Sequence, residues 1–284
     1  MVSGSVLVVA AIRVGPARVP SQESPEAAVE LLVERGYTAC EIDCERGFWL
    51  DYPWAERLGE LAREHGIALS LHAPLFGFMG HRERDKKFKM AVGVLDRSAG
   101  IAAAAGAAPV VFHPGYFLGR TREEAIADVV EQLGELGERL DAKGRLVPFG
   151  VEVMGRVAEL GSLDDVLAIA RAVPWVRPVL DFAHMHATSD GGFTGVEPFA
   201  AALEAADETL EPRAPFHIHF SAIQFANRNE TKHLPYGEGT LRAEPLREAL
   251  DPFDREATVI SESPDEASSQ AIREILLAAA AAPE

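Results

Sequence analysis

Residues 109–152, PVVFHPGYFLGRTREEAIADVVEQLGELGERLDAKGRLVPFGVE, contain a complete strand–helix–strand unit, and this unit decides the fold. Its first apolar run, PVVFH, ends in His113, and its last run, PFGVE, ends in Glu152. Between the two runs we expect a helix, because Thr121 and Glu124 have the spacing of a capping box. The unit therefore predicts two strands that end in polar side chains and are joined by a helical crossover.

The same alternation of β-branched runs and helical patterns occurs eight times along the chain. We expect the strands at about 5–12, 38–43, 67–72, 109–113, 148–152, 177–181, 215–220 and 257–262. Eight strand–helix units in 284 residues predict either a closed (β/α)8 barrel or an open doubly wound α/β sheet. No linker or break in composition divides the chain, so a single domain is expected over residues 1–284.

The ends of the predicted strands carry side chains that bind metal ions. These residues are His72, His113, Glu152, Asp181 with His184, His219, and Glu262, and His233 follows in a loop. In a closed barrel the C-terminal ends of all strands surround one mouth, whereas in an open sheet the outer strands lie far apart. Because ligands from six strands can converge only at a barrel mouth, the pattern favours a (β/α)8 TIM barrel.

The number and type of these residues predict more than one metal ion. Three carboxylates at neighbouring strand ends would repel one another unless cations lie between them. Eight candidate ligands exceed the three or four that one zinc ion needs, so two or three Zn²⁺ ions are expected, with Mn²⁺ or another divalent ion as alternatives. His217 shares a strand face with His219, and we interpret it as a buried, hydrogen-bonded histidine rather than a ligand.

Net charge, apolar stretches and cysteine content limit the partners and the cellular compartment that are expected. A net charge of −17 argues against non-specific coating of nucleic acid, although residues 81–90 hold five Lys or Arg and two acids. No apolar stretch reaches the roughly 20 residues that span a bilayer, so no membrane partner is expected. Cys40 and Cys44 do not form a disulfide framework, and we interpret them as buried free thiols of a cytoplasmic protein.

Several segments resemble the endonuclease IV family of abasic-site endonucleases, within the xylose-isomerase-like TIM barrels. They are SLHAPLFG (70–77), FHPG (112–115), VEVMG (151–155), LDFAH (180–184), HIHFSAI (217–223), KHLPYGEG (232–239) and SESP (261–264). The resemblance covers the third to eighth strands in order. It implies a zinc-dependent hydrolase of DNA repair that acts on damaged double-stranded DNA and incises it 5′ of abasic sites.

The resemblance also implies roles for individual residues. His72 and His113 would hold one zinc with Glu152, and Glu152 would bridge to a second zinc bound by Asp181, His219 and Glu262, as the motifs imply. His184 and His233 would belong to a third site.

At that third site Thr231 stands where the family has an Asp. The alternatives are a weak third site, no third site, or a site that Asn229, Glu230 or water completes. Glu262, or alternatively Glu152, would orient or deprotonate the attacking water. Leu75 and Phe76 are the apolar pair suited to insertion into the DNA stack, with packing under their own loop as the alternative.

A second function remains open on the sequence. A divalent-metal sugar isomerase or epimerase of the same barrel superfamily would use Glu152, Asp181, His219 and Glu262 around one ion. The acidic net charge and Thr231 favour that alternative, whereas the additional histidines favour the endonuclease. A metal-binding scaffold without catalytic activity is the third possibility.

Overall fold

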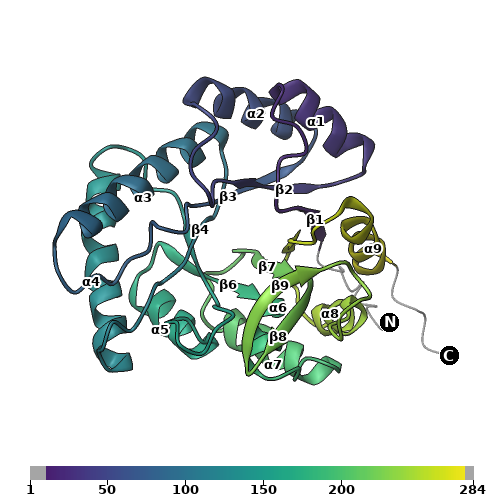
Figure 1. The fold of residues 1–284 in the computed structure, drawn as a ribbon. Coiled ribbons are helices and arrows are strands. Elements are labelled where there is room, and N and C mark those ends of the chain that lie inside the picture. Colours follow the sequence, from purple (N-terminus) through teal and green to yellow (C-terminus); the bar gives the residue numbers. More distant parts are fainter. Residues whose placement is uncertain (1–10, 279–284) are drawn as a thin grey trace, which may run out of the picture.

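The computed structural model of this protein describes residues 11–278, and its core is one eight-stranded parallel sheet. The strands are β1 (Ile12–Pro16), β2 (Ala39–Asp43), β3 (Ala68–His72), β4 (Val110–Phe112), β5 (Phe149–Glu152), β6 (Val176–Asp181), β7 (Phe216–Phe220) and β10 (Ala257–Ser261). Their order in the sheet is β1-β10-β7-β6-β5-β4-β3-β2. Figure 1 shows helices around the outside of this ring, so the fold is the predicted (β/α)8 TIM barrel.

Helices follow the strands and cover the outer face of the sheet. They are α1 (Pro25–Glu34), α2 (Tyr52–Glu64), α3 (Lys86–Ala105), α4 (Arg122–Asp141), α5 (Leu163–Ala172), α6 (Phe182–Thr188), α7 (Val196–Asp207), α8 (Ala243–Leu250) and α9 (Glu266–Leu277). The predicted capping box is present, because the Glu124 amide donates to Thr121 Oγ1 (3.2 Å) and the Thr121 amide donates to a Glu124 carboxylate oxygen (2.9 Å). Within residues 11–278, no helix has both the length and the apolar character needed to cross a membrane.

The barrel closes where β1 meets β2. The Thr38 amide donates to the Val14 carbonyl oxygen at 3.0 Å, and a Cβ added at Gly15 would stand only 1.7 Å from the Ala39 carbonyl oxygen. Only glycine allows the two backbones to approach so closely. The two edge strands of the sheet are therefore brought together, and all strand ends share one mouth.

The prediction from the sequence placed the first strand wrongly and did not include one hairpin. Part of the predicted strand at 5–12 lies outside the described residues, and the observed β1 overlaps it only at Ile12. The prediction followed the most apolar run, whereas β1 (IRVGP) is set by its parallel pairing with β10 and the close contact at Gly15. The other seven strands agree with the prediction to within one residue at each end. The antiparallel hairpin β8 (Ala222–Ala226) and β9 (Asn229–Leu234) stands apart from the barrel sheet, beside α6 (Figure 1).

Candidate metal centre

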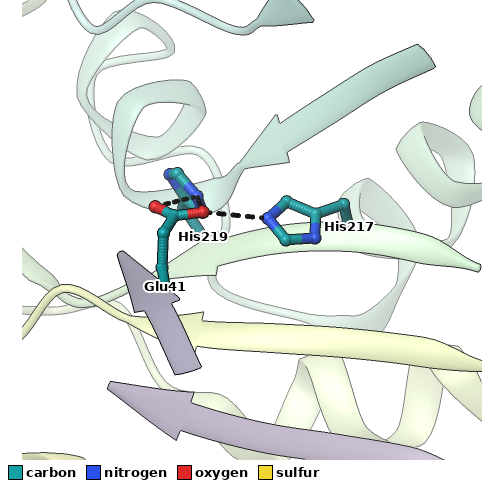
Figure 2. Close-up of side chains that lie close together, drawn as sticks. All are labelled: Glu41, His217 and His219. Atoms are coloured by element: carbon teal, nitrogen blue, oxygen red, sulfur yellow. Dashed lines mark hydrogen bonds and ion pairs between the residues drawn. The ribbon is translucent and has the colours of Figure 1, made fainter. Parts of the chain in front are cut away.

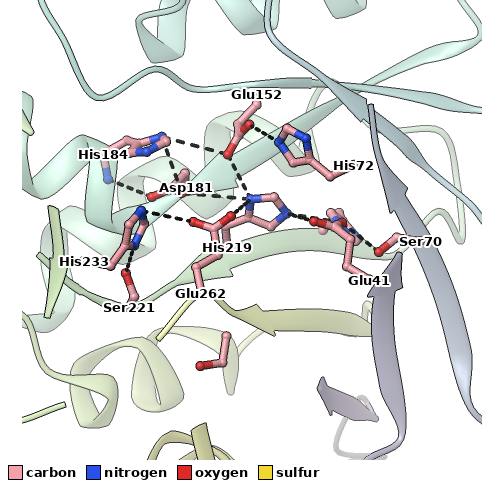
Figure 3. A network of polar contacts seen from close by, with 12 residues as sticks. Glu41, Ser70, His72, Glu152, Asp181, His184, His219, Ser221, His233 and Glu262 are labelled. Carbon is pink, nitrogen blue, oxygen red and sulfur yellow. Dashed lines mark hydrogen bonds and ion pairs between the residues drawn. The ribbon is translucent and has the colours of Figure 1, made fainter. Parts of the chain in front are cut away.

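The eight predicted ligands come together at the C-terminal mouth of the barrel, and Figure 3 shows most of them turned toward one another. His72, Glu152 and Asp181 are the last residues of β3, β5 and β6, His219 is near the end of β7, and His113 and Glu262 directly follow β4 and β10. His184 lies on α6 and His233 on β9. Their ligand atoms form three neighbouring clusters.

The first cluster consists of His72, His113 and Glu152. Glu152 Oε2 lies 3.2 Å from His72 Nε2 and 2.9 Å from His113 Nε2. His72 Nδ1 is 2.9 Å from the carbonyl oxygen of Ala73. Because a carbonyl oxygen only accepts, this bond places a proton on Nδ1 and lets Nε2 offer its lone pair to an ion.

The central cluster shares Glu152 with the first one. Its other carboxylate oxygen, Oε1, is 2.8 Å from His219 Nδ1. The same imidazole nitrogen lies 3.3 Å from Glu262 Oε1 and 4.0 Å from Asp181 Oδ2. Each oxygen of Glu152 thus faces a different cluster, which is the arrangement of a carboxylate that bridges two ions.

The third cluster contains a ligand that the sequence offered only as an alternative. Glu230 Oε2 lies 2.9 Å from His184 Nε2, and His233 completes the group. His184 Nδ1 donates to the Val153 carbonyl oxygen at 2.8 Å, which again leaves Nε2 available. A Cβ at Gly155 would stand 2.7 Å from both Glu230 and His184 side-chain atoms, so glycine makes room for this contact.

A β-bulge explains why Glu230, rather than Thr231, faces the site. In the hairpin, Gln224 pairs with Lys232 while the next residue, Phe225, pairs with Glu230, so Thr231 is the extra residue. Side chains alternate along a regular strand, which would put Thr231 and His233 on one face. The bulge reverses this alternation, and Thr231 donates its hydroxyl to the Gln224 carbonyl oxygen (2.9 Å) at the exposed side.

The electrostatics of the central cluster fit a site for divalent cations. Burial and repulsion from Glu262 and Glu152 raise the pKa of Asp181 well above its ordinary value. Asp181 Oδ1 accepts from the His184 amide (2.7 Å), but among residues 11–278 its buried Oδ2 has no hydrogen-bond partner. A cation would satisfy this oxygen and relieve the repulsion among the carboxylates, so the residues present suit bound metal.

The remaining two carboxylates stay ionised beside the histidines. Burial opposes ionisation of Glu152, but attraction to His219 and hydrogen bonds from His113 and His219 lower its pKa well below the ordinary range. Burial likewise opposes ionisation of Glu262, but attraction to His219 and their hydrogen bond lower its pKa to about 2. For His72, burial disfavours the charged ring, yet hydrogen bonding and attraction to Glu152 raise its pKa to about 10. The raised pKa of His72 favours its charged form next to Glu152 in the metal-free protein.

A further carboxylate, Glu41, was missed by the sequence reading. It lies in the middle of β2, and Figure 2 shows it between His217 and His219, one layer below the mouth. His217 is hydrogen-bonded to Glu41 (3.3 Å), which agrees with its interpretation as a buried, bonded histidine. The available signal was a charged residue inside the buried strand ACEID.

The surface around the mouth combines apolar and polar side chains. Leu75 and Phe76 are each 44% exposed in the loop after β3. A cleft of about 230 Å³ opens beside the ligands, and its lining includes Arg18, Glu45, and Glu262. Glu262 therefore belongs both to the lining of this cleft and to the central cluster.

The basic segment precedes and begins α3. Arg82, Lys86, Lys87 and Lys89 are exposed. Arg84 instead forms ion pairs with Glu131 and Glu135 on α4, each at 2.8 Å. Four of the five cations in this segment therefore extend into solvent without such pairing within the described residues.

The match to known families extends over nearly the whole barrel. The family model described as xylose isomerase-like TIM barrel matches residues 29–280. The chain belongs to this family. An uncharacterized protein from Methanocaldococcus jannaschii is 29% identical over 253 residues, which cover 88% of this chain and 91% of that protein. A probable endonuclease 4 from Shouchella clausii is 28% identical over 185 residues, and this match spans 62% of this chain and 60% of the relative's length.

Solved structures with the same fold include both nucleases and sugar epimerases. Endonuclease IV from Thermus thermophilus superposes with a TM-score of 0.71 at 21% identity, covering 93% of this chain and 97% of that one. A D-tagatose 3-epimerase-like protein superposes with a TM-score of 0.68 at 20% identity, covering 89% and 92%. At these identities the structural likeness supports the fold alone. The family match, in contrast, identifies the chain as an enzyme of this barrel superfamily, and its clustered His, Asp and Glu groups could hold divalent metals.

Proposed function

We propose that this protein is a metal-dependent phosphodiesterase that incises DNA on the 5′ side of abasic sites. The observation that carries the proposal is Glu152, whose two oxygens face two separate ligand clusters. Paired ions about 3.5–4 Å apart are a common device for displacement at phosphorus. A sugar epimerase with one ion would not need the histidines of the first and third clusters.

The proposed ion-binding groups are the three clusters, and zinc is the expected metal because imidazole and carboxylate suit it. Ions bound there would neutralise the phosphate and lower the pKa of the attacking water. Glu262 would then orient that water, since its side chain is 11% exposed and lines the open cleft. Glu152 suits this role less well, because both of its oxygens already contact histidines.

The reaction is a hydrolysis in which the oxygen of water bonds to phosphorus and the P–O3′ bond breaks. The products are a 3′-hydroxyl and a 5′-phosphate on the abasic sugar, and the proton lost by water balances the proton gained by the 3′-oxygen. Leu75 and Phe76 would fill the gap left by the missing base. The exposed cations of the 82–89 segment would contact backbone phosphates, against the overall charge of −17.

The alternative is a divalent-metal sugar epimerase or isomerase, and one observation favours it. Asp181, His219, Glu152 and Glu262 form a complete four-ligand set by themselves. Such a set could hold one ion while its carboxylates transfer protons next to a carbonyl. This function predicts full activity with a single ion per chain.

The test is a labelled duplex with one abasic site, incubated with zinc-loaded protein and with His113→Ala. We expect a zinc-dependent nick 5′ of the lesion and its loss in the variant. His65→Ala, which changes an exposed histidine at the end of α2, is the matched control and should cut normally. Absence of the nick in protein with two or more bound ions, together with turnover of a ketose, would refute the proposal in favour of the epimerase.

A further inference from the structure

Beneath the metal-binding mouth lies a second, fully buried polar layer. Glu41 reaches from β2 toward β7, where His217 and His219 occupy the same strand face two residues apart (Figure 2). His217 Nε2 is 3.3 Å from Glu41 Oε2. His219 Nε2 lies against both carboxylate oxygens, 3.2 Å from Oε1 and 3.4 Å from Oε2. Burying a carboxylate this deeply costs folding free energy unless it is paired. The partners of Glu41 therefore need a structural or functional role.

The hydrogen bonds around Glu41 determine which nitrogen of His219 carries a proton. Ser70 Oγ also donates to Glu41 Oε2, at 2.7 Å. Glu41 Oε2 is thus surrounded by the Ser70 hydroxyl and the Nε2 atoms of His217 and His219, and a carboxylate among such groups acts as the acceptor. His219 must therefore donate from Nε2. Its other nitrogen, Nδ1, faces Glu152 and Glu262 and can offer a lone pair there.

We propose that Glu41 is a positioning residue for the central metal site. By accepting the Nε2–H of His219, it selects the tautomer and the ring orientation in which Nδ1 is a metal ligand. Carboxylates that hold metal-binding histidines in this way typically contribute about 10–100-fold in metal affinity. This inference requires that the central cluster binds an ion, but it is independent of whether the substrate is DNA or a sugar.

A fourth ion between Glu41, His217 and His219 is the competing interpretation, because their ligand atoms also lie within 4.8 Å of one another. Such an ion would require His219 Nε2 as a ligand. A neutral imidazole has only one nitrogen free to bind metal, so this ion would compete with the central cluster for His219. The central cluster offers four ligands and adjoins the open cleft, whereas the inner group offers three buried ones. The contacts of Glu41 Oε2 with the two histidines are therefore better described as hydrogen bonds, whereas Oε1 has no hydrogen-bond partner within residues 11–278.

The decisive experiment measures zinc affinity rather than turnover. Glu41→Gln and the parent protein are titrated with zinc in competition with a chromophoric chelator, and total zinc is counted at saturation. We expect one equivalent to bind about 10–100-fold more weakly in Glu41→Gln, with the number of ions unchanged. Glu64→Gln, an exposed residue of α2, is the matched control and should retain parental affinity. Ser70→Ala removes a neighbour of Glu41 without touching His219, and its effect should be smaller.

A measurement on the parent protein keeps the inference testable if Glu41→Gln does not fold. Nitrogen-15 NMR of histidine-labelled, zinc-loaded protein should show His219 with a proton on Nε2 and metal on Nδ1. A proton on Nδ1 would overturn the inference. So would an unchanged affinity in folded Glu41→Gln, or the clean loss of one zinc equivalent with the others unaffected, which would make Glu41 a ligand of its own ion.

Discussion

Two single substitutions at adjacent positions of β9 test which residue completes the third cluster. One removes a negative charge and the other adds one. Glu230→Gln removes the carboxylate that contacts His184 Nε2 at 2.9 Å, while Thr231→Asp adds a carboxylate at the position expected from endonuclease IV-like motifs. Because the bulge turns Thr231 toward the Gln224 carbonyl oxygen and solvent, the added charge should not reach His184 or His233.

The expected loss in Glu230→Gln follows from the contact that disappears. Hydrogen bonds to charged groups contribute about 1.5–3 kcal/mol, and about 1.4 kcal/mol corresponds to tenfold in affinity. The affinity for one zinc should therefore fall at least about 10-fold. This is a lower limit, because a bond from carboxylate to metal is stronger than the hydrogen bond that replaces it in the metal-free protein.

Zinc counting and chelator competition on the two variants and the parent protein give the answer. We expect Glu230→Gln to lose or weaken one equivalent and Thr231→Asp to match the parent protein. The reasoning is refuted if Thr231→Asp tightens an ion while Glu230→Gln leaves all ions unchanged. That result would mean that the hairpin is regular in solution and that residue 231 faces the site.

Three other outcomes are expected. Glu262→Gln should keep the fold and much of its zinc but lose about 10²–10⁴-fold in turnover, measured on zinc-quantified protein beside Glu64→Gln. Near-normal turnover would remove Glu262 from the reaction. Alanine at both Leu75 and Phe76 should weaken abasic-duplex binding about 5–100-fold at every salt concentration, and equal weakening on undamaged duplex would contradict a lesion-filling role. Because the pKa of His72 is raised from 6.5 to about 10 in the metal-free fold, its stabilising contribution is complete below pH 6.5 and is lost as pH rises toward 10. Urea unfolding of metal-free protein should show this decline, on the order of 5 kcal/mol at most, and a flat profile would contradict it.

The barrel and the clustering of the candidate ligands could be predicted from the sequence because both depend on local patterns. An apolar run followed by His or Glu identifies a strand and its C-terminal end at once, as at His113 and Glu152. The capping box at Thr121 similarly marks where α4 begins. These signals depend on neighbours a few residues away, so they can be read without knowing the fold.

The features that escaped prediction depend on contacts between distant segments. Glu41 is interpretable only when β2 and β7 face each other across the barrel interior, a relation between residues 176 positions apart. Glu230 faces the site because of a bulge, which shifts strand alternation by one residue and has no simple sequence mark. The true β1 is moderately apolar, and its place is determined by pairing with β10 at the other end of the chain.

The distribution of the ligands along the chain has a consequence for folding. The first ligand, His72, and the last, Glu262, are far apart in the sequence, yet both face Glu152 or its neighbour His219. The complete set of clusters can therefore assemble only when the strands from β3 to β10 are all in place. Each site at a free metal concentration about 100 times its Kd adds about 2.7 kcal/mol to the free energy of unfolding. Bound ions would thus link strands that are distant in the sequence. The thermal unfolding midpoint of the protein would then rise with the concentration of free zinc.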